Sequence, residues 1–280
     1  MGDEYVQTPY AKFNRHKERG TYDTETIHNL INTTSVLHVS FVDPSSPFPV
    51  SLPMIGQIGT YEHDASPHLY LHGYVSSRIM NVTSSSGQGQ GLPMTITATK
   101  LDGLVLALSP FSHSYNYRSA ILFGHATVLP SFLPPSSEDA TKTPNPEALY
   151  AMQLITDSVL PGRWQHTRTP PTSAEMQSTR ILKVAIAAAT AKARTGPPKD
   201  ERADLRNRDV VAKVWAGVVP VWETFGEPVP AGYQGGGEAL AVPEHVRRFV
   251  EAENGNAEEY AVGVAAEEVA VGRRGTDDDE

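Results

Sequence analysis

One stretch decides the fold of this chain, and it reads Leu69-Tyr70-Leu71-His72-Gly73-Tyr74-Val75-Ser76-Ser77-Arg78-Ile79-Met80. It begins as an apolar run typical of a buried strand and ends in small hydroxyl residues and an arginine. A strand that leads through such a turn into a helix offers backbone N–H groups, two hydroxyls and a fixed cation. These groups suit an anion, and a phosphate above all. The alternative is that Ser77 and Arg78 merely cap the helix, because Ser-Ser-Arg is a weak pattern.

The composition is that of an ordinary globular protein. The 280 residues include 39% hydrophobic and 20% charged residues, which is enough for a sizeable core. Cysteine is absent, so disulfides and thiolate chemistry are excluded. The first residues lack the apolar core of a secretory signal, and no apolar run is long enough to cross a bilayer. We therefore expect a cytoplasmic protein that has no contact with a membrane.

The net charge of −9 is unevenly distributed. From residue 231 onward there are 12 acidic and 4 basic residues, a net of −8, so the preceding part carries about −1. Neither part has the clustered basic face that nucleic-acid binding requires. No spacing of histidines indicates a metal site.

The rest of the chain predicts a mainly β fold with peripheral helices. Helices are expected at 21–31, from residue 77, at 146–155 and at 173–178. Six closely spaced strands are expected at 35–42, 50–55, 69–75, 94–100, 104–108 and 119–129, which favours a small antiparallel barrel. Asp102-Gly103 between the fourth and fifth strands is a hairpin signal. Gly124 indicates a bulge or the close approach of another backbone. Residues 179–186 predict a further strand.

The chain divides on composition into three parts. Residues 1–20 form a polar arm, residues 21–230 the folded domain, and residues 231–280 a low-complexity acidic tail. Residues 242–253 have one apolar face and allow a helix, whereas residues 272–280 should be disordered. We expect a chain lacking residues 235–280 to keep its oligomeric state and any bound cofactor.

The order of several motifs resembles the flavin-binding split-barrel superfamily, the pyridoxamine 5′-phosphate oxidase-like proteins, and within it the nitroimidazole reductase-like or flavin-nucleotide-binding branch. The motifs that carry the resemblance are Arg19-Gly20-Thr21-Tyr22-Asp23, His38-Val39-Ser40-Phe41, Tyr70-Leu71-His72-Gly73 with Ser77-Arg78, Leu101-Asp102-Gly103-Leu104-Val105, Asn116-Tyr117-Arg118-Ser119, Pro161-Gly162-Arg163-Trp164, Lys192-x-Arg194-x-Gly196 and Trp215 to Pro220. The resemblance spans roughly residues 12–230 and implies a six-stranded antiparallel split β-barrel, the FMN-binding split barrel, followed by the acidic disordered tail.

The resemblance also implies a cofactor site for FMN. Ser77 and Arg78 match the residues that hold the phosphate, with Ser76 and the backbone of Gly73, Tyr74 and Val75 assisting. The strand Ser51, Leu52, Pro53, Met54 and Ile55 matches the one that runs beside the isoalloxazine ring, and His72 would lie nearest the chemistry as the catalytic residue. The segment Asn116, Tyr117, Arg118 and Ser119 matches the one that reaches the cofactor of the opposite subunit in a homodimer.

The function implied is that of an FMN-dependent oxidoreductase. It would pass hydride or electrons from a transient nicotinamide donor through FMN to a small acceptor, such as a nitroaromatic compound. Ile79 stands where the vitamin oxidases of the family tend to carry lysine, which argues against pyridoxamine-phosphate oxidase activity proper. The alternative is a flavin- or haem-binding module without turnover, in which His72 or a neighbouring histidine ligates haem. A purely structural dimer is the third reading.

Overall fold

The computed structural model describes residues 3–62, 64–86, 91–134, 142–232 and 241–268. These residues form two compact units. The first is built from residues 3–99 and 119–192, and the second from residues 100–118 and 193–268. The second unit thus takes residues from both sides of the expected boundary at 230/231, and the division into an arm, a domain and a tail stays a prediction.

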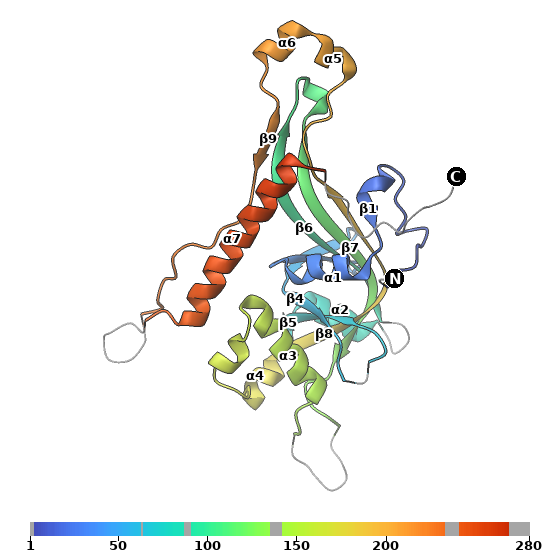
Figure 1. Cartoon of the computed structure of the whole chain (residues 1–280). Helices are drawn as coiled ribbons and strands as arrows, with labels where there is room; N and C mark the ends of the chain where they lie inside the picture. Colours follow the sequence, from blue (N-terminus) through green and yellow to red (C-terminus); the bar gives the residue numbers. More distant parts are fainter. Residues whose placement is uncertain (1–2, 63, 87–90, 135–141, 233–240, 269–280) are drawn as a thin grey trace. The chain divides into compact units, whose positions relative to one another are not determined.

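The described strands form one sheet (Figure 1). They are β1 (Gly20–Thr21), β2 (Leu37–Phe41), β3 (Val50–Met54), β4 (Gly56–Gly59), β5 (His68–Tyr74), β6 (Leu92–Leu106), β7 (Ser114–Leu129), β8 (Thr179–Arg194) and β9 (Gly217–Pro220). Their order is β3-β2-β6-β7-β8-β5-β4, with β1 paired to β8 and β9 paired to β6. The pairs β1–β8, β2–β3, β2–β6, β4–β5, β5–β8 and β6–β9 are antiparallel.

The described α-helices are α1 (Thr24–Asn32), α2 (Arg78–Ser85), α3 (Pro146–Val159), α4 (Ser173–Ser178), α5 (Arg202–Arg206), α6 (Arg208–Lys213) and α7 (Glu244–Ala266). Three 3₁₀ turns are η1 (Lys17–Arg19), η2 (Pro110–Ser112) and η3 (Arg163–His166). Side-chain caps fix several of the helix starts. Asp23 accepts a hydrogen bond from the Thr26 amide at 2.7 Å at the start of α1, and Asn145 accepts one from the Glu147 amide at 3.1 Å at the start of α3.

The predicted mainly β, antiparallel fold with peripheral helices is confirmed, but the predicted count of six strands is wrong. Nine strands are present in the described residues. Three of them, β1, β4 and β9, are two to four residues long. Strands this short carry too little alternation for the sequence pattern to reveal them.

The predicted hairpin at Asp102-Gly103 is also wrong, since β6 runs through it without a break from Leu92 to Leu106. Asp102 is buried, and its carboxylate accepts two hydrogen bonds from Arg118 at 2.7 and 3.0 Å. A Cβ on Gly103 would lie 2.9 Å from Val218 Cγ1, so the glycine admits strand β9. Both residues that indicate a turn locally are therefore needed here for long-range contacts.

Gly124 in β7 has the role that its sequence context indicates. A Cβ there would lie 2.5 Å from the carbonyl oxygen of Ala185. The glycine therefore allows the close approach of the β8 backbone, which was one of the two predicted reasons for it.

Strand β5 separates two hydrophobic cores of the first unit. Leu69 and Leu71 belong to the larger core, which includes Ile27 and Ile31 of α1. Tyr70 belongs to a smaller core beneath α3. Because successive side chains of a strand point to opposite faces, His68, Tyr70 and His72 share the face that α3 covers. Figure 1 shows α3 and α4 beside β5 and β8.

In the second unit, α7 runs beside β9 (Figure 1). Its Ala261 and Val264 are buried. Part of the region expected to be a disordered tail is therefore a packed helix of 23 residues. The expected disorder of residues 272–280 lies outside the described residues. None of the helices in the described ranges combines the length and the apolar character that a bilayer crossing requires.

Candidate functional site

The turn after β5 is fixed by backbone hydrogen bonds. The Ser77 amide donates to the Tyr74 carbonyl at 2.9 Å, and the Val75 amide donates to the Ser178 carbonyl at 2.9 Å. Ser77 is the N-cap residue of α2, and its carbonyl accepts from the Asn81 amide at 3.1 Å. The predicted strand–turn–helix is thus present, with the two serines at the beginning of the helix.

The hydroxyl of Ser77 is buried and has no hydrogen-bond partner among the described residues, and it makes no capping bond to its own helix. A buried hydroxyl without a partner is costly, and an oxygen atom of a bound ligand would satisfy it. Gly73 lies next to it, since a Cβ there would be 3.6 Å from Ser77 Oγ and 2.7 Å from Met80 Cε. Glycine at position 73 therefore leaves room for the Met80 side chain next to the Ser77 hydroxyl.

Arg78 is held in place at the first position of α2 by Asp43. Its Nε donates to Asp43 Oδ2, and the Asp43 side chain is 6% exposed whereas that of Arg78 is 47% exposed. Hydrogen bonds from the backbone and hydroxyl of Ser45 and from Arg78 lower the pKa of Asp43 to about 2. The carboxylate therefore stays charged and fixes the guanidinium beside the serine turn, where an anion at a helix N-terminus would be stabilised.

His72 links this turn to the end of strand β3. Its amide donates to the Ile55 carbonyl at 3.1 Å. His72 is accessible to solvent on one side, and its ring has no hydrogen-bond partner within the described part of the chain. Partial burial lowers the pKa of His72, so the imidazole is neutral at pH 7.

The segment Ser51–Ile55 lies against the turn, as the sequence predicts for two parts of one site. A Cβ on Gly73 would be 3.7 Å from Met54 Cε. Met54 points into the core, whereas Ser51, Pro53 and Ile55 are exposed. Ser51 accepts a hydrogen bond from the hydroxyl of Ser40 on β2 at 3.2 Å. The exposed edge and backbone of this strand are therefore available to a ligand held by the turn.

The third predicted segment, Asn116–Ser119, is engaged within the chain. Asn116 is fully buried, donates to the carbonyls of Gly196 at 3.2 Å and Val264 at 3.3 Å, and accepts from Arg194. Arg118 forms the two-point pair with Asp102. The contact of this segment with a cofactor of a second subunit stays a prediction. Its partly exposed neighbours Tyr117 and Ser119 are nearer to solvent than the amide of Asn116.

Asp43 and Asp102, the carboxylates that hold Arg78 and Arg118, do not stand out in the sequence. Asp43 precedes a Pro-Ser-Ser turn, which explains a local cap better than a contact with residue 78. Asp102 has the sequence context of a hairpin. Only the pairing of distant arginines with these carboxylates gives them their roles.

The comparisons with known proteins agree with this fold. The family model of pyridoxamine 5′-phosphate oxidase matches residues 23–193. The solved structure of the flavocytochrome Anf3 from Azotobacter vinelandii is 26% identical with a TM-score of 0.64, and the match covers 86% of this chain and 97% of that one. That of the FAD and haem binding protein from Mycobacterium smegmatis is 27% identical with a TM-score of 0.63, covering 83% and 98%. No curated protein matches the sequence.

The matched region is more than half of the chain and includes the serine turn, Arg78, His72 and strand β3. The chain belongs to the pyridoxamine 5′-phosphate oxidase family. The family predicted from the sequence is thereby confirmed.

Proposed function

We propose that this protein binds a flavin nucleotide, with a phosphate group at Ser77 and Arg78 and the ring system beside Ser51–Ile55, and uses it in electron transfer. The observation that carries the proposal is the buried, unpartnered hydroxyl of Ser77 next to a guanidinium fixed by Asp43. These groups fit a phosphate in number and in charge. The exposed residues of β3 and Ile55 supply the remaining surface.

The identity of the flavin is open between FMN and FAD. The sequence resemblance indicates FMN, whereas one similar structure is described as an FAD and haem binding protein. Because both flavins carry a phosphate next to the ribityl chain, the contacts of Ser77 and Arg78 fit either of them.

A bound flavin supplies hydride and single-electron transfer. The residues of this chain bind and orient it, and His72, neutral at pH 7, is the group at the site that can accept a proton. In this proposal a nicotinamide is the transient donor, and a small molecule such as a nitroaromatic compound is the acceptor.

A second candidate function includes haem. Two similar structures are described as a flavocytochrome and as an FAD and haem binding protein. Within this chain, His72 has a neutral and unpartnered imidazole, which is the form that ligates haem iron. This candidate makes the protein an electron carrier with two cofactors, and it assigns His72 to iron ligation instead of proton transfer.

Both candidates include a homodimer in which Asn116–Ser119 of each subunit contributes to the site of the other. Light scattering on the purified protein tests this part. A mass of one chain at concentrations at which the cofactor is bound would contradict it.

The visible spectrum of the protein as purified tests the function, followed by release of the cofactor and its identification by mass. Flavin bands with one equivalent per chain support the first candidate, and an additional Soret band supports the second. A colourless protein that takes up neither FMN, FAD nor haem on titration would refute both. His72→Ala separates the two roles of the histidine, since it should remove the Soret band only if His72 ligates haem.

A further inference from the structure

A cavity lies near the end of β5 that is opposite the turn at Ser76 to Arg78. Strand β4 ends at Gly59, which pairs with His68 at the start of β5, whereas that turn follows Tyr74 at its end. Beyond Gly59 the chain and helix α3 form the walls of a cavity of about 620 Å³. This volume lies within the range of small-molecule sites in proteins.

Three aromatic rings belong to the lining of this cavity. Tyr61, Tyr150 and Trp164 come from three separate segments of the chain, and all three are partly exposed. The rings of Tyr61 and Tyr150 have centroids 5.5 Å apart at an angle of 50°. Leu149 and Pro146 add further apolar surface. Aromatic rings in the lining of one cavity offer a ligand apolar contact and, for a cation, attraction to the ring electrons.

The charge of the lining is one-sided. Among the described residues that line the cavity, Glu62 is acidic and none is basic. Glu62 is exposed, and its carboxylate has no hydrogen-bond or ion-pair partner within the described part of the chain. An anionic ligand would therefore find no counter-charge here, whereas a cation would find one carboxylate and three rings.

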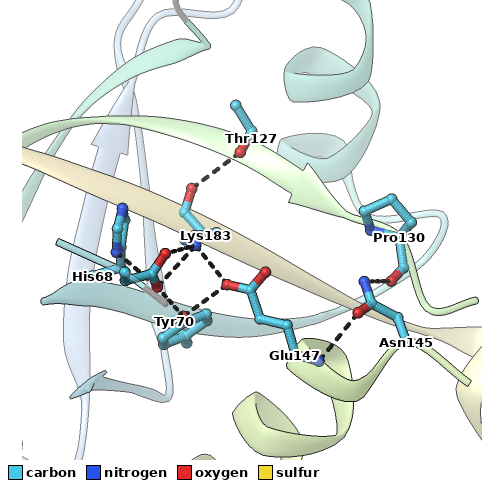
Figure 2. Close-up of polar contacts among 8 residues, drawn as sticks. His68, Tyr70, Thr127, Pro130, Asn145, Glu147 and Lys183 are labelled. Carbon is cyan, nitrogen blue, oxygen red and sulfur yellow. Dashed lines mark hydrogen bonds and ion pairs between the residues drawn. The ribbon is translucent and has the colours of Figure 1, made fainter. Parts of the chain in front are cut away.

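Partly buried ion pairs fix the two walls of the cavity to the sheet, as Figure 2 shows for Lys183, Glu147 and Tyr70. Lys183 Nζ lies 2.8 Å from Asp64 Oδ1, two residues after Glu62, and 2.6 Å from Glu147 Oε1, at the start of α3. The Tyr70 hydroxyl donates to Glu147 Oε1 at 2.9 Å. Burial alone would lower the pKa of Lys183, but Asp64 and Glu147 outweigh it and raise that pKa, so the cross-link stays charged.

Close packing fixes Tyr150 as well. A Cβ on Gly59 would lie 2.4 Å from the Tyr150 hydroxyl, so this glycine admits the ring. The Tyr150 ring also packs edge-on against Tyr70, with centroids 5.8 Å apart at 79°. The Tyr150 ring is therefore held in place before any ligand binds, which reduces the entropy lost on binding.

We propose that this cavity binds an organic cation of the quaternary ammonium class, with its alkyl groups against Tyr61, Tyr150 and Trp164 and its charge toward Glu62. Aromatic walls and a single carboxylate are the groups that recognise such ions in water. A metal ion would need several oxygen or nitrogen ligands, and the described residues hold no cluster of three or more such side chains. This proposal does not depend on the proposed flavin site, because the two sites use different residues.

The test uses the full-length protein and a matched pair of probes, choline and its uncharged carbon isostere 3,3-dimethylbutan-1-ol, by titration calorimetry. We expect choline to bind about tenfold more tightly than the isostere, because only choline gains the cation–π contacts. Equal affinity for the two probes, or binding of neither, would overturn the proposal.

Variants locate the site. Trp164→Leu should weaken choline binding about tenfold, whereas the control Trp215→Leu, at an exposed tryptophan of the second unit, should leave it unchanged. Glu62→Gln should weaken choline binding about two- to threefold without affecting the isostere, because an exposed charge is screened. Equal losses in the two tryptophan variants would overturn the assignment. Tyr61→Leu replaces Trp164→Leu if circular dichroism shows that the latter is unfolded.

Discussion

Two arginines predicted to contact the same cofactor have opposite surroundings. Arg78 in the first unit is held by one contact from Nε to Asp43, and nearly half of its side chain is exposed. Arg118 in the second unit gives Nε and one terminal nitrogen to Asp102, and Tyr260 of α7 packs its ring 3.6 Å from the guanidinium carbon. The terminal nitrogens of Arg78 therefore remain for a ligand, whereas Arg118 uses Nε and a terminal nitrogen for a contact within the fold. The type of residue alone does not distinguish the two roles.

The carboxylates show the same difference. Asp43 has Ser45 as a further partner, which contributes both an amide and a hydroxyl hydrogen bond. Asp102 is 3% exposed, and Arg118 is its partner on the neighbouring strand. Loss of the arginine should therefore leave Asp43 hydrogen-bonded and Asp102 buried as an uncompensated charge. The following predictions start from this contrast.

The largest effect is expected for Arg118→Leu. It should lower the free energy of unfolding by about 3 kcal/mol, because it leaves the buried carboxylate of Asp102 without its partner. Urea unfolding measures this loss. The double variant Arg118→Leu with Asp102→Leu should recover much of the stability. If the free energy of unfolding of Arg118→Leu is within about 1 kcal/mol of that of the parent, the pair contributes no more than an exposed ion pair does.

Arg78→Ala should affect ligand binding more than it affects the stability of the fold. We expect flavin affinity to fall by about 2 kcal/mol, roughly 30-fold, because a charge-assisted contact with the phosphate is lost. Stability without flavin should change by less than about 1 kcal/mol, since this arginine is half exposed. Quenching of flavin fluorescence on titration gives the affinity. Arg168→Ala, at an exposed arginine paired with Glu175, is the matched control and should leave flavin affinity unchanged.

Ser77→Ala should move two quantities in opposite directions. Flavin affinity should fall by about 1 kcal/mol, while the flavin-free protein should gain up to about 1 kcal/mol of stability because a buried hydroxyl without a partner is removed. Thermal unfolding with and without flavin measures both. Reduced stability of the flavin-free variant would show that the hydroxyl already has a structural role.

The smallest effect concerns acid stability. Asp43 has a pKa of about 2 in the folded chain and an ordinary value of 3.8, so its contribution is complete above about pH 4 and is lost as the pH falls toward 2. Asp43→Asn should flatten this part of the profile. Urea unfolding at several values between pH 2 and pH 5 provides the comparison, and parallel profiles for parent and variant would show that other carboxylates govern it.

The strand–turn–helix at Gly73 to Arg78 could be predicted because its signals are local. An apolar run, a glycine, two serines and an arginine lie within ten residues, and each acts on its near neighbours. The fate of Arg118 could not be predicted, because its partners Asp102 and Tyr260 lie 16 and 142 residues away in the sequence. Gly103 likewise depends on β9, more than 100 residues further on. Sequence patterns do not reveal the role of a residue whose contacts are with a strand far away in the sequence.

The same distinction applies to the three rings of the proposed cation site. Tyr61, Tyr150 and Trp164 are unremarkable in the sequence, and the ion pairs of Lys183 with Asp64 and Glu147 connect two of the segments that carry them. A tryptophan in a Pro-Gly-Arg-Trp motif is more easily interpreted as a packing residue. Its place in the lining of the cavity, together with Tyr61 and Tyr150, indicates ligand contact instead.

The contacts of α7 decide where this protein can be shortened. Tyr260 covers Arg118, and the carbonyl of Val264 accepts a hydrogen bond from Asn116 and another from the Gly196 amide. A recombinant chain that ends near residue 230, where the composition becomes acidic, would lose all three contacts and expose the surface beneath them. We therefore expect removal of the helical part of residues 235–280 to lower the stability of the chain. Recombinant chains and protease-resistant fragments should extend at least to Ala266.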